Sequence, residues 1–70
     1  MNEISFPLTG EFIELYKLLK VTGLCESGGI AKHAISEGQV QVNGAVETRK
    51  AFKVRAGHSI EFEGGKISVH

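Results

Sequence analysis

The sequence has 70 residues, of which 41 % are hydrophobic, and its formal net charge is zero. This length predicts one domain spanning residues 1–70, with its core from about residue 10 to residue 70, and leaves little room for an enclosed active site. A single cysteine excludes an internal disulfide and fits a reducing compartment. No apolar stretch approaches the ~20 residues that cross a bilayer, and the N-terminus lacks a secretory signal pattern. We therefore expect a cytoplasmic protein with no membrane partner.

The charges are distributed unevenly along the chain. Residues 1–26 carry two lysines and four glutamates, residues 27–58 carry five basic residues and two glutamates, and residues 59–70 carry one lysine and two glutamates. Within the central part, the stretch from Thr48 to Arg55 holds four positive charges and no negative one. Because salt screens charges more than about 10 Å apart, this basic stretch matters more for binding an anionic polymer than the net charge of zero.

The first predicted element after an extended lead-in over residues 1–8 is a helix from about Gly10 to Thr22, with Thr9 as its N-cap. Its apolar residues recur at i, i+3, i+4 and i+7, which predicts one buried stripe. The stripe consists of Phe12, Leu15, Tyr16 and Leu19. The two aromatic residues of this stripe are therefore expected in the core.

A second helix is predicted from Gly28 to Glu37. The hydroxyl of Ser27 suits its N-cap because it can accept a hydrogen bond from a free backbone N–H of the first turn, and Gly38 ends the helix. The predicted buried stripe consists of Ile30, Ala31, Ala34 and Ile35. The residues expected to face solvent are Lys32, His33 and Ser36.

After the second helix the hydrophobic period changes from about 3.6 to 2, which predicts strands. Asn43-Gly44 is a strong turn signal, and a two-residue turn there would pair Val42 with Ala45. A three-residue loop instead pairs Val42 with Val46 and keeps the valines on one face, so we favour the longer loop.

A final hairpin is predicted around a turn at Gly64-Gly65. That turn pairs apolar with apolar residues and a glutamate with a lysine. The predicted pairs are Phe62 with Ile67, Ile60 with Val69, and Glu63 with Lys66. Between the hairpins, Phe52 and Val54 are expected to point inward, before a turn at Ala56-Gly57. The whole predicts an α+β fold in which two N-terminal helices pack on one face of a small antiparallel sheet.

Several segments, in this order and spacing, resemble a known RNA-binding family. They are Leu18-Leu19-x-Val21, Glu26-Ser27, Ala31-Lys32-x-x-Ile35, Gly38-x-Val40-x-Val42-Asn43-Gly44 and Val54-x-x-Gly57-x-x-Ile60. Together they resemble the S-four RNA-binding domain, named after a small-subunit ribosomal protein, and cover about residues 12–62. The short length and the stretch from Gly44 to Lys50 look closest to the small stand-alone YbcJ-type bacterial proteins. The resemblance implies an αL-type motif that binds structured RNA through the second helix and the loop and strand after it.

The resemblance also places Ser27, Lys32, Gln39 and Asn43 near the RNA face. Many family members have arginine directly after the capping serine, where this chain has Gly28. Many also open the first helix with Arg-Leu-Asp, to which Glu14-Leu15-Tyr16 corresponds here, so two basic positions are absent. We expect the basic stretch to compensate for them. The predicted RNA-binding residues are Ser27, Gly28, Gly29, Lys32, Gln39, Asn43, Thr48, Arg49, Lys50, Lys53 and Arg55.

Each of these residues also has a purely structural explanation. The backbone N–H groups of Ser27-Gly28-Gly29 suit a phosphate, or they form a plain cap whose glycines pack closely. Lys32 contacts RNA or is only a solubilising charge. Asn43 touches RNA or only forms the turn.

The basic stretch has the strongest local pattern. Alternation sends Phe52 and Val54 to one face and Lys53 and Arg55 to the other, which makes a footprint for phosphates. Arg49 is the best candidate within it, because its planar fork suits bidentate phosphate contact. The alternative is a solvated edge strand whose lysines discourage pairing with other chains.

No enzymatic constellation is visible in the sequence. There is no aspartate, the three histidines are scattered, and zinc spacing, a nucleophile–base set and a nucleotide-binding glycine loop are all lacking. We therefore expect no enzyme, no metal site and no cofactor. The expected partner of a monomeric, ribosome-associated bacterial protein is structured RNA, such as ribosomal or transfer RNA. The alternative is a protein-interaction adaptor on the ribosome or another ribonucleoprotein.

Overall fold

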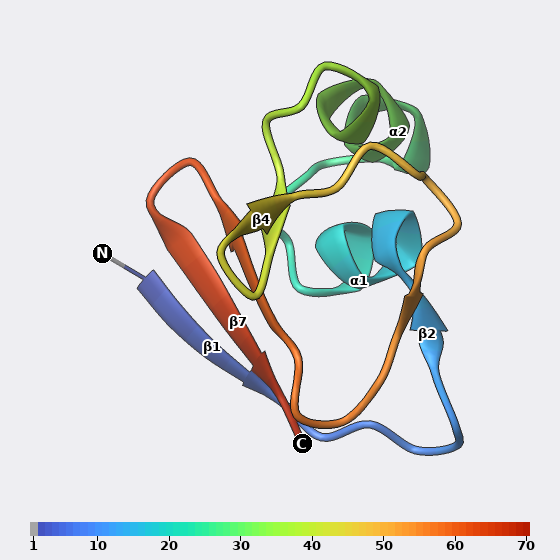
Figure 1. The fold of residues 1–70 in the computed structure, drawn as a ribbon, viewed down its shortest axis with the longest axis vertical. Helices are drawn as coiled ribbons and strands as arrows, with labels where there is room; N and C mark the ends of the chain where they lie inside the picture. The colour runs from blue at the N-terminus through green and yellow to red at the C-terminus, as the bar shows by residue number, and fades with distance from the viewer. Residues whose placement is uncertain (1) are drawn as a thin grey trace.

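The computed structural model describes residues 2–70, which form two helices and two β-sheets (Figure 1). The helices are α1 (Leu15–Val21) and α2 (Gly28–Ser36). The strands are β1 (Asn2–Phe6), β2 (Ile13–Glu14), β3 (Gln41–Val42), β4 (Ala45–Val46), β5 (Lys53–Val54), β6 (Ser59–Phe62) and β7 (Gly65–Val69). The predicted lead-in over residues 1–8 falls partly on Met1, which lies outside the described residues.

The larger sheet has five strands in the order β1-β7-β6-β3-β4. β1 runs parallel to β7, whereas the other neighbours are antiparallel. The prediction of an antiparallel sheet is therefore wrong, and the sheet is mixed. The lead-in joins it as a strand because Ile4 and Phe6 alternate with polar residues and pack against the core. A separate small sheet pairs β2 with β5.

One hydrophobic core contains side chains from both helices and both sheets. Its largest fully buried members are Leu15, Leu18, Leu19, Ile35, Val40, Val54, Ile60 and Ile67. The inward position of Val54 and the alternation of β6 and β7 are as the sequence predicts, because Phe62 and Val69 are buried as well. That both helices cover one face of the larger sheet stays a prediction.

The first helix is shorter than predicted. It begins at Leu15 rather than Gly10, and Ile13–Glu14 form β2 instead, since their backbone pairs with β5. Gly10 has φ +108°, which a right-handed helix excludes. Thr9 is therefore not the N-cap, and Phe12 lies ahead of the helix with 39 % of its surface exposed.

The second helix begins as predicted at Gly28. Ser27 caps it, because its Oγ accepts a hydrogen bond from the Ile30 backbone N–H at 3.2 Å. The helix ends at Ser36, one residue earlier than predicted. Ile30 was expected to be buried but is 50 % exposed, because the packed side of α2 consists of Ala31, Ala34 and Ile35.

The turn at Asn43-Gly44 has two residues, not the three that we favoured. Val42 faces Ala45 and Gln41 faces Val46 in the register of β3 and β4. Asn43 and Gly44 both have positive φ, +52° and +84°, which is the type I′ conformation that matches strand twist. Val46 consequently points away from Val42 and is 57 % exposed.

The last hairpin turns at Glu63-Gly64, one residue before the predicted position. Ile60 faces Ile67 and Glu61 faces Lys66, so the predicted pairs are each wrong by two residues. A shift of two keeps every side chain on its predicted face. Gly65 lies in β7 instead of the turn, and a Cβ there would come within 2.8 Å of the Leu24 side chain.

Asn43→Ala is expected to lower the free energy of unfolding by about 1–2 kcal/mol. The alanine would adopt positive φ, and it would lose the hydrogen bond that the Asn43 Oδ1 accepts from the Ser59 backbone N–H at 2.9 Å. Asn43→Gly loses the same hydrogen bond but relieves the backbone, so it should cost less. Urea unfolding of both variants measures the difference. Equal destabilisation would contradict a role for the backbone conformation.

Candidate functional site

The basic stretch lies beside the start of α1. The Leu15 backbone N–H donates to the Phe52 carbonyl at 2.9 Å, and the Tyr16 N–H donates to the Lys50 carbonyl at 3.2 Å. Figure 1 shows β2 and β5 side by side where the two segments meet. The backbone therefore holds the basic side chains next to two aromatic residues of the N-terminal half, Phe12 and Tyr16.

Phe12 is flanked by two cations. The Lys53 Nζ lies 5.0 Å from the ring centroid, and the Arg55 Cζ lies 6.0 Å from it. Cations at this distance are attracted by the negative face of an aromatic ring. Because the ring is 39 % exposed, both the cations and part of the ring are open to a ligand.

The Tyr16 ring, on α1, lies against the start of α2. The Lys32 Nζ lies 4.7 Å from its ring centroid, and the Lys17 Nζ lies 5.9 Å from it. A Cβ added to Gly28 would lie 3.8 Å from the same ring, so the first turn of α2 packs close to Tyr16. A Cβ at this position would make ordinary van der Waals contact with the ring, so the start of α2 and Tyr16 are neighbours.

Arg49 lies over a third ring, with its Cζ 5.2 Å from the Phe52 centroid. Arg49, Ala51, Phe52 and Lys53 line a hollow of about 380 Å³. We call the three rings and their cations the cation–aromatic surface. It consists of Phe12, Tyr16, Phe52, Lys17, Lys32, Arg49, Lys53 and Arg55.

The guanidinium fork of Arg49 is occupied by a carboxylate of the chain itself. The Arg49 Nε donates to the Glu47 Oε2 at 2.9 Å and its Nη2 donates to the Oε1 at 3.2 Å, and the Arg49 backbone N–H also donates to Oε2 at 3.0 Å. The side-chain hydrogen bond from Arg49 lowers the pKa of the Glu47 carboxyl. A phosphate that binds this Nε–Nη2 side of Arg49 must therefore displace Glu47.

Glu47→Gln is expected to strengthen RNA binding about two- to fivefold, because it removes the charge that competes with phosphate for Arg49. The measurement is the dissociation constant for a labelled RNA hairpin at fixed low salt. Glu37→Gln, an exposed glutamate at the end of α2, is the matched control for the change in net charge. Equal gains for both variants would show that Glu47 has no specific effect.

The structure gathers some predicted site residues and separates others. Lys32, Arg49, Lys53 and Arg55 belong to the cation–aromatic surface, and Gly28 and Lys50 adjoin it through Tyr16. Gly29 and Thr48 are exposed nearby in the sequence, while the Ser27 hydroxyl is used by the cap. Asn43 is bonded to Ser59 in the turn, and Gln39 lines a hollow with Glu61 and Glu63.

The sequence reasoning missed the two aromatic residues, which it assigned to the core. Tyr16 is only half-buried and Phe12 is exposed. Tyr16 belongs to the triplet Glu14-Leu15-Tyr16, which corresponds to the opening of the first helix in the S-four pattern. The resemblance therefore marks this place as part of the site but does not indicate an aromatic contact. Among residues 2–70, no group of three or more His, Cys, Asp or Glu side chains is arranged to hold a metal ion.

The S4 domain family matches residues 6–70 of this sequence. The chain belongs to the S4 domain family. Within the described residues, neither helix of this S4 domain is long and apolar enough to cross a membrane.

Two curated S4-type relatives are similar over most of their length. The sequence is 54 % identical over 57 residues to "Putative RNA-binding protein YbcJ" of Escherichia coli (strain K12), which covers 81 % of each chain. It is 39 % identical over 54 residues to "Probable ribosome maturation protein RlbA" of Bacillus subtilis (strain 168), covering 77 % of this chain and 76 % of that one.

A solved structure shares the fold. It is the solution structure of YbcJ from E. coli, reported to reveal an αL motif involved in RNA binding. The TM-score is 0.74 at 48 % identity, and the match covers 99 % of this chain and 89 % of the other. The fold expected from the S-four resemblance is thereby confirmed as an α+β αL motif.

Proposed function

We propose that this protein binds structured RNA through the cation–aromatic surface. The proposal is supported by five exposed cations that lie over three aromatic rings. These cations and rings come from the first helix region, from α2 and from the basic stretch. Cations supply contacts to phosphates, and partly exposed rings supply stacking platforms for unpaired bases. The names of the relatives YbcJ and RlbA support RNA as the ligand and the ribosome as its setting.

The proposal assigns a role to each predicted contact residue. Lys32, Lys50, Lys53 and Arg55 contact phosphates, and Arg49 does so when it leaves Glu47. Of the remaining predicted contacts, Ser27, Gly28, Gly29 and Thr48 lie beside this surface. Gln39 and Asn43 lie apart from it, so their contacts require RNA that extends beyond the surface. Residues 1–70 act as one monomeric cytoplasmic domain that binds rather than catalyses, as membership of the S4 family favours.

The proposal is tested by titrating labelled transfer RNA and ribosomal RNA hairpins at several salt concentrations. If about 3–5 phosphates are engaged, log K should fall against log salt with a slope of roughly −2 to −4. A fully paired duplex of the same length should bind more weakly than a hairpin, because its bases are not free to stack on the rings. Failure of every RNA to bind at low salt would overturn the proposal.

A further inference from the structure

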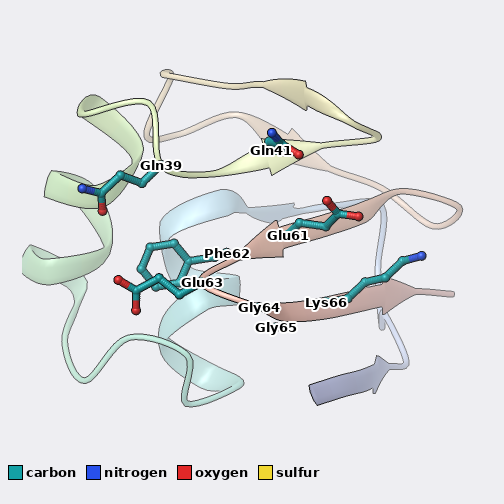
Figure 2. A pocket seen from close by; sticks show the side chains of 8 residues that line it. All are labelled: Gln39, Gln41, Glu61, Phe62, Glu63, Gly64, Gly65 and Lys66. Carbon is teal, nitrogen blue, oxygen red and sulfur yellow. The ribbon is translucent and has the colours of Figure 1, made fainter. Parts of the chain in front are cut away.

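A groove with the opposite chemistry lies on the other flank of α2. One hollow of about 290 Å³ lies over β3, β6 and β7, and a second of about 320 Å³ lies between α2 and the turn after β6. The two share Gln39, Phe62 and Glu63, so they adjoin each other and are treated together. We call them the acidic groove. Figure 2 shows its sheet half, with Gln39 and Glu63 on the side of α2.

The floor of the acidic groove is apolar. Leu24, Ile30 and Phe62 line it, and Ile30 is 50 % exposed. The Leu24 side chain lies close to Gly65, where an added Cβ would come within 2.8 Å of it. An apolar floor of this kind suits an aliphatic side chain of a ligand.

The rim of the acidic groove is negatively charged. Glu26, Glu61 and Glu63 line it, together with the His33 imidazole and the ammonium group of Lys66, which is the cross-strand neighbour of Glu61. Figure 2 shows Lys66 extending away from Glu63, towards the far end of β7. Because the three glutamates outnumber the one lysine, the rim repels a phosphate backbone and attracts lysine or arginine side chains.

The groove and the cation–aromatic surface lie on different flanks of one helix. Ile30 lines the groove, while Lys32 lies over Tyr16. Residues two positions apart in an α-helix, such as Ile30 and Lys32, are separated by about 200° around the helix axis. A partner in the groove can therefore bind while RNA occupies the other surface.

We propose that the acidic groove docks a short basic segment of a protein, in which lysine or arginine alternates with aliphatic residues. The aliphatic side chains contact Leu24, Ile30 and Phe62, and the cations pair with Glu26, Glu61 and Glu63. The amides of Gln39 and Gln41 at the edge offer hydrogen bonds to the peptide backbone. This inference goes beyond the proposed RNA-binding function, because it adds a protein partner at a second surface.

The test uses a fluorescein-labelled octapeptide of alternating lysine and leucine, titrated against the full chain by fluorescence anisotropy. Combining Glu61→Gln with Glu63→Gln should weaken peptide binding about five- to tenfold. Glu11→Gln, an exposed carboxylate outside the groove, is the control and should leave binding unchanged. A second variant, Ile30→Ser, should also weaken binding, whereas Val21→Ser at a 62 % exposed site outside the groove should not.

These experiments distinguish failure of the docking proposal from failure of the RNA-binding proposal. The Glu61/Glu63 variant should bind an RNA hairpin at least as well as the unmodified protein. A Lys53→Ala variant should lose RNA affinity but keep its peptide affinity. Equal peptide binding by the Glu61/Glu63 variant and the unmodified protein would overturn the docking proposal. So would an NMR titration in which RNA, but not the peptide, shifts the amide signals of Gln39, Glu63 and Gly65.

Discussion

Replacing Lys32, Lys53 and Arg55 together by alanine is expected to weaken RNA binding about 30- to 300-fold at ~0.1 M salt. Each phosphate contact releases roughly 0.9 counterion, so it contributes up to about one decade of affinity at that salt concentration. The salt slope should become shallower by roughly 2 to 3. All three side chains are exposed, so the substitutions should leave the core intact. Filter binding at four or more salt concentrations gives both quantities.

A matched control separates this surface from a general loss of charge. Lys66→Ala removes one positive charge from the sheet side, where Lys66 lines the acidic groove. Lys53→Ala removes one charge from the cation–aromatic surface. The two variants have the same net charge, so the proposal requires a clearly larger loss of RNA affinity for Lys53→Ala. Equal losses would indicate unspecific attraction of RNA to the protein.

Phe12→Ala is expected to lower RNA affinity about five- to hundredfold, because stacking of a base on an aromatic side chain contributes about 1–3 kcal/mol. The ring precedes α1 and is 39 % exposed, so its loss should reduce the free energy of unfolding by only ~1–2 kcal/mol. Dissociation constants are measured at a temperature where urea unfolding shows every variant to be folded.

Two further substitutions at Phe12 distinguish stacking from simple apolar contact. Phe12→Tyr keeps an aromatic face beside Lys53 and Arg55 and should bind RNA within about twofold of the unmodified protein. Phe12→Leu keeps apolar volume without a ring, and it should lose most of the affinity that Phe12→Ala loses. Normal RNA binding by Phe12→Leu would show that the ring serves packing and does not stack on a base.

Local chemistry was sufficient to predict the second helix and the positions of the buried strand residues. Ser27 and the following stripe mark the start of α2, and alternation marks the inward residues of β6 and β7. The hairpin registers were not predicted, since they depend on backbone conformation at single residues. Both turns place a non-glycine residue, Asn43 or Glu63, at positive φ directly before a glycine. Gly64-Gly65 offers a second pair of turn residues beside Glu63-Gly64, so the residue types alone do not fix the register.

The prediction of the candidate site from the sequence was limited for a different physical reason. The basic stretch could be found because its charges are consecutive in sequence. Its aromatic partners could not, because Phe12 and Lys53 become neighbours only when β2 pairs with β5. That pairing involves two residues on each strand, too few for a periodic signal. A helical period extended back to Phe12 therefore misassigned the ring to the core.

The parallel pairing of β1 with β7 has a mechanical consequence. Figure 1 shows the start of β1 and the end of β7 at opposite ends of this strand pair. A pulling force applied between those two points is directed along both strands, so it loads their shared hydrogen bonds in shear and all at once. An antiparallel pair pulled from one end would instead unzip one bond at a time. The domain should therefore resist end-to-end traction, such as that of an unfolding motor, more strongly than its small core suggests.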